Sequence, residues 1–284
     1  MENPPAYDDH FHMSPSGRNI EALKDFERAG GTGITFVTLP YPEVHISKAE
    51  DWRESYGITF DLAERARRET SVEVNVAVGP YPILLMSIAE EQGLGKATEI
   101  MKAGMDIAAD AVREGKAKAI GEVGRPHFPV DRQIWDASNE VLEYGMSLAK
   151  ELDVPVIIHC ENEDDTDLSL SEIAKRAGLA PEMVIKHSSP PWVTPEETHG
   201  VMPSMPASKS YIKEALSKGS DRFMLETDYI DDPSKPTAIM ACDTVPKKVR
   251  WMLASGTGDD ELVGRICRDL PEFYYHRRSS RACG

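Results

Sequence analysis

The chain has 284 residues, of which 40% are hydrophobic and 28% are charged, a composition that allows a large core and excludes a fibrous or disordered protein. It has 32 Lys and Arg against 48 Asp and Glu, and the net charge of -16 disfavours a long polyanion as a partner of the whole surface. No apolar run reaches the ~18 residues that span a bilayer, and the first residues lack the basic and apolar regions of a signal peptide. We therefore expect a cytoplasmic protein without a membrane partner.

Eight short apolar runs recur along the chain, each of the kind expected for a buried parallel strand. They lie at 7–12, 33–40, 72–79, 117–124, 154–160, 183–189, 199–206 and 222–229. The segments between them carry helical signals. For example, Ile20, Leu23 and Phe26 share one face of a helix that we predict over 19–30.

The clearest helix is predicted over 131–153, with Asp131 as its N-cap. Parallel strands need crossover connections, so strand-helix alternation repeated eight times predicts a (β/α)₈ TIM barrel of class α/β. We expect one domain over residues 1–284. An open doubly wound sheet is the alternative, but such a sheet more often carries a glycine-rich phosphate loop after its first strand, where this chain has "HFHMSPSG". The sequence leaves the role of 83–95 open.

The ends of these runs carry residue types that bind metals. His10 and His12 stand at positions i and i+2 of the first run, so both imidazoles point to one face and can reach one point. Four other runs end in Glu122, His159, His187 and Asp228. Functional residues of a TIM barrel lie at these strand ends. Four imidazoles and two carboxylates suit a pair of divalent cations such as zinc, with one carboxylate bridging them.

Structural explanations also exist for single members of this set. His159 alone could be a core histidine with satisfied hydrogen bonds, and Glu122 could be structural, although a carboxylate at a barrel mouth is costly unless it is paired. Glu226 lies one layer deeper than Asp228 on the same strand face, so we expect it to orient a ligand or a Lys side chain. Lys186 should face outward, where its amine needs a partner.

The four cysteines form no C-x-x-C pair, which argues against a disulfide framework and against a thiolate zinc site. Any metal must therefore be held by imidazole and carboxylate groups. Strand alternation turns Cys160 away from the side of His159, so we expect it to pack against the helices and not to act as a nucleophile.

The order of the segments "HFH", "GEVGR", "VIIHCE", "IKHS" and "LETDY" resembles that of the TatD-type metal-dependent hydrolases of the amidohydrolase superfamily, from Tyr7 to about Tyr275. The resemblance implies a TIM barrel with a dinuclear metal site. Its ligands would be His10, His12, Glu122, His159, His187 and Asp228, with Glu122 bridging and Asp228 also handling protons. The chain departs from the family pattern in three loops, at Arg125–His127, in "HSSPPWVTPEE" and in "DYIDDPSKP". These loops would shape the substrate pocket.

Metal-activated water would be the nucleophile, and Asp228 would accept its proton. Arg125, His127 and Lys209 are candidate substrate contacts, because two of them are cations and His127 lies in the loop after Glu122. We expect a hydrolase with two divalent ions, zinc first and manganese, magnesium, cobalt or nickel as alternatives. It would cleave a phosphoester in a small phosphorylated substrate or at a nucleic-acid end. An amide, lactone or aminoacyl-ester hydrolase is the second hypothesis, and a non-catalytic metal-binding barrel is the third. The oligomeric state is left open.

Overall fold

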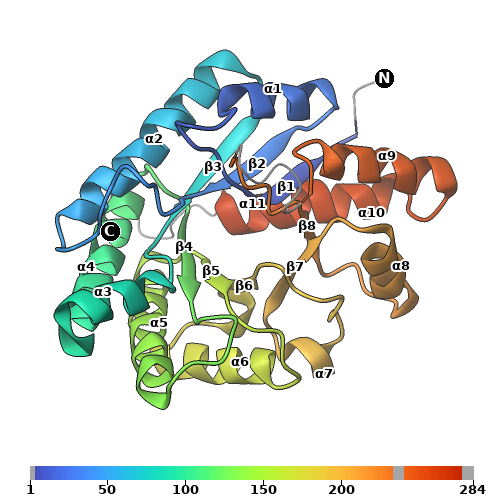
Figure 1. Ribbon diagram of the computed structural model, residues 1–284. Coiled ribbons are helices and arrows are strands. Elements are labelled where there is room, and N and C mark those ends of the chain that lie inside the picture. Colours follow the sequence, from blue (N-terminus) through green and yellow to red (C-terminus); the bar gives the residue numbers. More distant parts are fainter. Residues whose placement is uncertain (1–3, 233–239, 277–284) are drawn as a thin grey trace, which may run out of the picture.

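The computed structural model describes residues 4–232 and 240–276, and at its centre are eight parallel strands that pair in chain order (Figure 1). They are β1 (Tyr7–Phe11), β2 (Gly33–Val37), β3 (Glu73–Val78), β4 (Ala119–Gly124), β5 (Val156–His159), β6 (Val184–Lys186), β7 (Met202–Pro206) and β8 (Met224–Glu226). Phe11 forms a parallel bridge with Tyr229, and the backbone N–H of His12 donates to the carbonyl oxygen of Tyr229 over 2.9 Å. The last strand thus returns to the first, and the sheet forms a nearly closed barrel.

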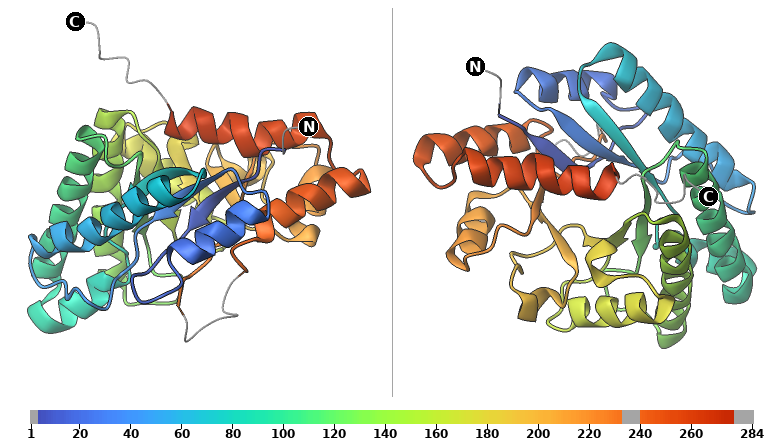
Figure 2. Two further views of the ribbon diagram at one scale, coloured as in Figure 1. Left: turned by 90° about the horizontal axis from the view of Figure 1, so that it is seen from above. Right: turned by 180° about the vertical axis from the view of Figure 1, so that it is seen from behind.

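Helices connect the strands and surround them on the outside (Figures 1 and 2). They are α1 (Ile20–Arg28), α2 (Asp51–Glu69), α3 (Leu84–Gln92), α4 (Leu94–Arg113), α5 (Arg132–Leu152), α6 (Thr166–Ala177), α7 (Pro195–Thr198), α8 (Lys209–Ser217), α9 (Thr244–Ser255), α10 (Asp260–Gly264) and α11 (Leu270–Tyr275). The alternation confirms the predicted (β/α)₈ TIM barrel. No helix in residues 4–232 or 240–276 combines the length and the apolar character that crossing a membrane requires.

Helix α5 forms where the sequence pattern predicts it. Val141, Leu142 and Leu148 lie on its buried face, and each such side chain contributes about 1.5–3 kcal/mol when it leaves water. Asp153 ends the helix in the left-handed conformation, with φ 55°. Asp131 occupies the N-cap position as predicted, but its side chain makes no capping hydrogen bond, so the cap itself contributes little here.

The segment 83–95 contains the junction between two helices. α3 ends at Gln92, α4 begins at Leu94, and Gly93 between them has φ 84°, a conformation that glycine adopts without a steric penalty. Leu85 and Ile88 of α3 are buried, and α3 packs against α4. The segment therefore adds a helix to the outer layer of the barrel.

Two residues, Lys186 at the end of β6 and Cys160 directly after β5, face the outer layer. Lys186 is fully buried, with its Nζ 3.0 Å from Oδ1 of Asp167 on α6 and 4.1 Å from the centroid of the Trp192 ring. The predicted need for a partner is met by this ion pair and by the aromatic ring. Cys160 packs against the hydrophobic core, and burial raises the pKa of its thiol to about 12. A thiol with this pKa carries almost no thiolate at neutral pH, so Cys160 is not an activated nucleophile.

Candidate metal centre

Five of the six predicted ligands come together at the carboxyl ends of β1, β4, β5 and β6. His10, His12 and Glu122 form a first triad in which one ligand atom of each residue lies within 4.8 Å of the other two. Glu122, His159 and His187 form a second triad by the same measure. Glu122 belongs to both triads, which is the arrangement that a carboxylate shared by two cations requires.

The carboxylate of Glu122 is held by imidazoles. Its Oε2 lies 3.1 Å from Nδ1 of His159, 3.2 Å from Nε2 of His187 and 3.9 Å from Nε2 of His10. Burial by itself would raise the pKa of Glu122, but the hydrogen bonds and charges of His159 and His187 outweigh burial and hold the pKa well below its usual value. Glu122 is therefore an ionised acceptor inside the barrel mouth.

His12 has a defined tautomer. Its Nδ1 lies 2.9 Å from the carbonyl oxygen of Val37, and because a carbonyl can only accept, the proton is on Nδ1. The lone pair on Nε2 is then free for a cation, in the way that metal-binding histidines are usually oriented. Burial lowers the pKa of His12, but the hydrogen bond to Asp228 and nearby negative charges raise it more, so the net shift is upward.

Asp228, the sixth predicted ligand, lies at the edge of the first triad and belongs to neither. Its Oδ1 is 3.4 Å from Nε2 of His12, and its side chain is 19% exposed. Asp228 has φ 49°, so its backbone is in the left-handed region. The position brings one carboxylate to the solvent side of the cluster.

His10 provides the test of whether the residues fit a metal. It is fully buried, stacks on His187 with the ring centroids 4.1 Å apart, and has no hydrogen-bond partner for Nδ1 or Nε2 among the described residues. An unpaired buried polar atom costs about 1–3 kcal/mol. Burial also lowers the pKa of His10 well below its usual value, so its imidazole is neutral, the form that binds metals. The donor set thus fits a divalent cation.

Glu226 lies behind His187, where the sequence analysis expects a residue that orients a ligand. Its Oε1 accepts the backbone N–H of Ser188 over 2.7 Å and lies 3.6 Å from Nδ1 of His187. His10, His187 and Glu226 also form a third group of potential ligands within 4.8 Å. Burial raises the pKa of Glu226, while contact with His187 lowers it.

The structure does not support Arg125 as a substrate contact. The side chain is buried, its Nε and Nη2 donate to the carboxylate of Glu161, and its Nη1 donates to Oγ of Ser169 over 3.0 Å and to Asn139. The ring of Trp135 covers the guanidinium at 4.6 Å. In this structure these partners occupy the guanidinium that the sequence analysis expected to face a substrate.

The other two predicted substrate contacts differ in position. Lys209 is exposed at the start of α8, and its Nζ lies 5.0 Å from the ring centroid of Trp251 on α9. His127 does reach the cluster, because its Nδ1 lies 2.8 Å from Nε2 of His159. Burial and the nearby charges of His159 and His187 lower the pKa of His127.

Two residues near the centre escaped the sequence analysis. Tyr81, in the loop after β3, packs edge-on against His159 with ring centroids 5.1 Å apart, and burial followed by the charges of Glu122 and Asp228 raises its pKa. Asp231 accepts backbone N–H groups from Ser14, Arg18 and Asn19, which joins the loop after β1 to the loop after β8. The sequence feature that could have identified both residues is their position in a loop that follows a strand.

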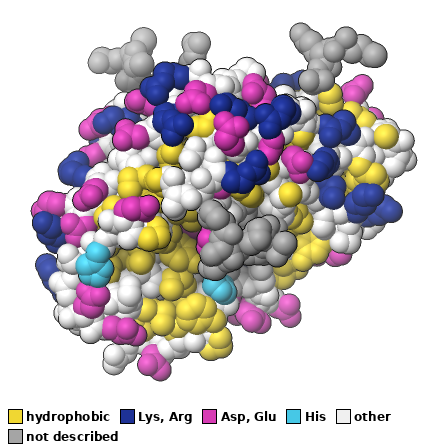
Figure 3. Space-filling model, turned by 45° about the horizontal axis from the view of Figure 1, so that its top comes forward, with side chains coloured by type: hydrophobic (Ala, Val, Ile, Leu, Met, Phe, Trp, Pro, Cys, Tyr) yellow, Lys and Arg dark blue, Asp and Glu magenta, His cyan; other side chains and the backbone are white. Residues whose placement is uncertain are grey.

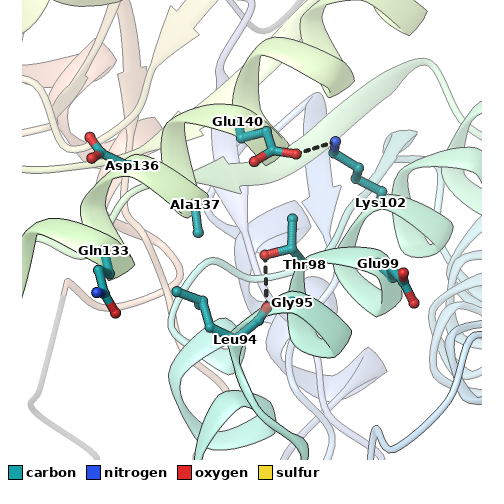
Figure 4. Close-up of a pocket in the computed structure, with 9 residues that line it drawn as sticks. All are labelled: Leu94, Gly95, Thr98, Glu99, Lys102, Gln133, Asp136, Ala137 and Glu140. Atoms are coloured by element: carbon teal, nitrogen blue, oxygen red, sulfur yellow. Dashed lines mark hydrogen bonds and ion pairs between the residues drawn. The ribbon is translucent and has the colours of Figure 1, made fainter.

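A groove on the outer layer of the barrel is an alternative candidate site. It measures about 580 Å³ and runs between α4 and α5, where Lys102 reaches across to Glu140 over 2.6 Å (Figure 4). Its lining residues come from these two helices and include none of the candidate metal ligands. The histidine cluster, and not this groove, therefore carries the chemistry that the sequence predicts.

Several known proteins are similar to this chain. An uncharacterized protein of Methanocaldococcus jannaschii is 33% identical over 279 residues, which cover 97% of both chains. An uncharacterized metal-dependent hydrolase of the same organism is 22% identical over 276 residues, covering 94% of this chain and 98% of the relative. The structure of the Escherichia coli phosphotriesterase homology protein, with phosphate in its active site, superimposes with a TM-score of 0.66 at 12% identity, covering 97% of this chain and 100% of the other. At that identity the likeness concerns the fold alone.

The model of the family described as "TatD related DNase" matches residues 7–276, nearly the whole chain. The match includes every residue of both triads as well as Asp228. The chain therefore belongs to the TatD related DNase family.

Proposed function

We propose that this protein is a hydrolase that uses two divalent cations, zinc first, to cleave a phosphoester in a small substrate or at a nucleic-acid end. One observation carries the proposal: Glu122 is shared by two triads of potential ligands. His10 and His12 would hold one cation and His159 and His187 the other, with Glu122 between them. Asp228 would complete the first triad from the solvent side.

When bound, such cations supply Lewis acidity and lower the pKa of coordinated water to about 7. The chain's own groups then determine how protons move. Val37 holds His12 in the tautomer whose Nε2 faces Asp228, and Asp228 is the partly exposed carboxylate beside it. Asp228 takes the proton from the attacking water and returns it to the leaving group.

The family and the surface charge support this substrate class. The family model is described as "TatD related DNase", and the active site of the Escherichia coli structural neighbour holds phosphate. The net charge is -16, and Lys and Arg side chains are interspersed with Asp and Glu on the face that Figure 3 shows. Affinity would come from the metal centre, which favours a small phosphoester or the end of a strand over the length of a duplex.

The buried state of Arg125 favours a second candidate, hydrolysis of a lactone, amide or aminoacyl ester. Because Glu161 neutralises Arg125, that guanidinium offers no anion-binding fork to a phosphate. A neutral acyl substrate would need none. The same water would attack a carbonyl carbon, and Asp228 would again take its proton and return it to the leaving group.

A panel assay of the zinc- or manganese-loaded protein tests the proposal. We expect turnover of bis(4-nitrophenyl) phosphate to exceed turnover of a lactone or an amide. In Asp228→Asn we expect phosphodiester turnover to fall by about 10²–10⁴-fold while the second triad keeps its cation. Acyl turnover without phosphodiester turnover would reverse the order of the two candidates. Unchanged activity in Asp228→Asn would contradict the assigned role of this residue.

A further inference from the structure

An imidazole pair links the metal centre to the loop after β4. Nδ1 of His127 lies 2.8 Å from Nε2 of His159, and the two rings meet at 69°. The other nitrogen of His159, Nδ1, lies 3.0 Å from Nε2 of His187 and 3.1 Å from Oε2 of Glu122. Nδ1 of His159 therefore faces the other two residues of the second triad, Glu122 and His187, and Nε2 faces His127.

This geometry determines where the protons must be when a cation is bound. A neutral imidazole has one N–H and one lone pair. If Nδ1 of His159 uses its lone pair to bind a cation, its proton is on Nε2. That N–H can then be satisfied only by an acceptor, and Nδ1 of His127 is in place to accept it. The opposite tautomer of His159 would direct a proton at the cation.

Two other histidines of the centre, His12 and His187, also have an acceptor facing Nδ1, whereas His10 has no partner among the described residues. Nδ1 of His12 donates to the carbonyl oxygen of Val37 over 2.9 Å, and Nδ1 of His187 faces the carboxylate of Glu226 at 3.6 Å. Metal-binding histidines usually have such a partner, which fixes both the tautomer and the ring orientation. His127 occupies the corresponding place for His159.

We propose that His127 is a positioning residue, which accepts the Nε2–H of His159 and thereby holds Nδ1 of His159 ready for the second cation. This inference rests on the proposed metal centre. The sequence suggested that His127 contacts the substrate, whereas this inference makes it a partner of His159, a proposed metal ligand. It also gives a function to one residue of the unusual Arg125–His127 stretch, where the sequence departs from the family pattern.

Three variants distinguish the effect of losing the hydrogen-bond acceptor from the effect of losing the volume of the ring. His127→Asn places Oδ1 where Nδ1 of the imidazole stands, His127→Gln moves the acceptor one bond further out, and His127→Leu removes it. The side chain lies in an exposed loop, so all three variants should fold, and circular dichroism and thermal unfolding check this. The primary measurement is the affinity for Zn²⁺ and Co²⁺ by calorimetry and by the Co²⁺ absorption spectrum.

We expect His127→Leu to weaken one of the two cation sites by about 10–100-fold, and His127→Asn to recover most of the loss. Long-range ¹H–¹⁵N spectra of the zinc-loaded native protein should show the proton of His159 on Nε2. A His127→Leu variant with native affinity at both sites, or a His159 proton on Nδ1, would overturn the inference and leave the metal centre intact. Failure of the native protein to bind two cations would overturn the proposed function as well.

Discussion

The guanidinium of Arg125 and the carboxylate of Glu161 form a buried ion pair beside the histidine cluster, with Nε of Arg125 donating to Oε2 over 3.2 Å and Nη2 donating to Oε1. The Arg125 side chain is 1% exposed and that of Glu161 is 14% exposed. Thr166 also donates to Oε1 of Glu161, which satisfies the carboxylate further. The pair joins the loop after β4 to the loop after β5, so its role is to hold the shape of the mouth.

Replacing Arg125 with Lys should therefore affect stability more than substrate binding. A lysine keeps the charge but cannot reproduce the bidentate fork or the stacking on Trp135. We expect the free energy of unfolding to fall by about 1.5–3 kcal/mol, because a hydrogen bond to a charged group contributes about that much and lysine makes fewer of them with Glu161. Urea denaturation measures this change, and KM should stay near the native value.

Arg132→Lys is the matched control. Arg132 forms an exposed ion pair with Asp136, and such pairs contribute about 0–1 kcal/mol, so this variant should be close to native. If Arg125→Lys were as stable as the native protein and KM rose sharply, Arg125 would contact the substrate after all.

Glu122→Gln should loosen one of the two cations. The amide keeps the shape of the side chain but lacks the negative charge that two cations would share, and its N–H₂ group repels them. We expect elemental analysis after dialysis to find two divalent cations per native chain and about one in the variant. Glu163→Gln, an exposed change in the loop after β5, serves as the control. Full metal content in Glu122→Gln would refute the bridging role.

The pH dependence of stability should contain a contribution from Asp9. Burial raises its pKa from 3.8 to about 8, even though the hydroxyl of Tyr275 donates to its Oδ1 over 2.6 Å. The folded state thus holds a proton that the unfolded chain releases near pH 4. The stability that this provides is complete below the unfolded pKa and is lost as the pH rises through about 8.

Asp9→Asn keeps an acceptor for Tyr275 and has no charge to bury. Between about pH 4 and about pH 8 its free energy of unfolding should therefore fall less steeply than that of the native protein. Denaturation of both proteins in chelator at several pH values measures the two slopes. Equal slopes would show that Asp9 does not titrate in this range.

Much of the centre could be predicted because its signals are local. The i, i+2 spacing of His10 and His12 places both imidazoles on one strand face whatever the rest of the chain does. The ends of parallel strands meet at one mouth, so Glu122, His159 and His187 were expected beside them. The structure brings these five residues together, and the eight predicted strands are present.

The partners of long side chains could not be predicted in the same way. Arg125 carries the charge that suits an anionic substrate, but Glu161 pairs with it, and the Nζ of Lys209 lies 5.0 Å from the centroid of the Trp251 ring. Tyr81 gave no periodic signal, since it lies in a loop after β3. Each of these contacts depends on residues that are distant in the sequence.

The sequence alone therefore determined the barrel and the residue types at its mouth, because strand period and strand order are local properties of the chain. Only the tertiary structure decided which nitrogen of His159 faces the cluster and which faces His127. The choice depends on how two loops pack against each other, and packing between distant segments is set by the whole core and not by spacing along the chain.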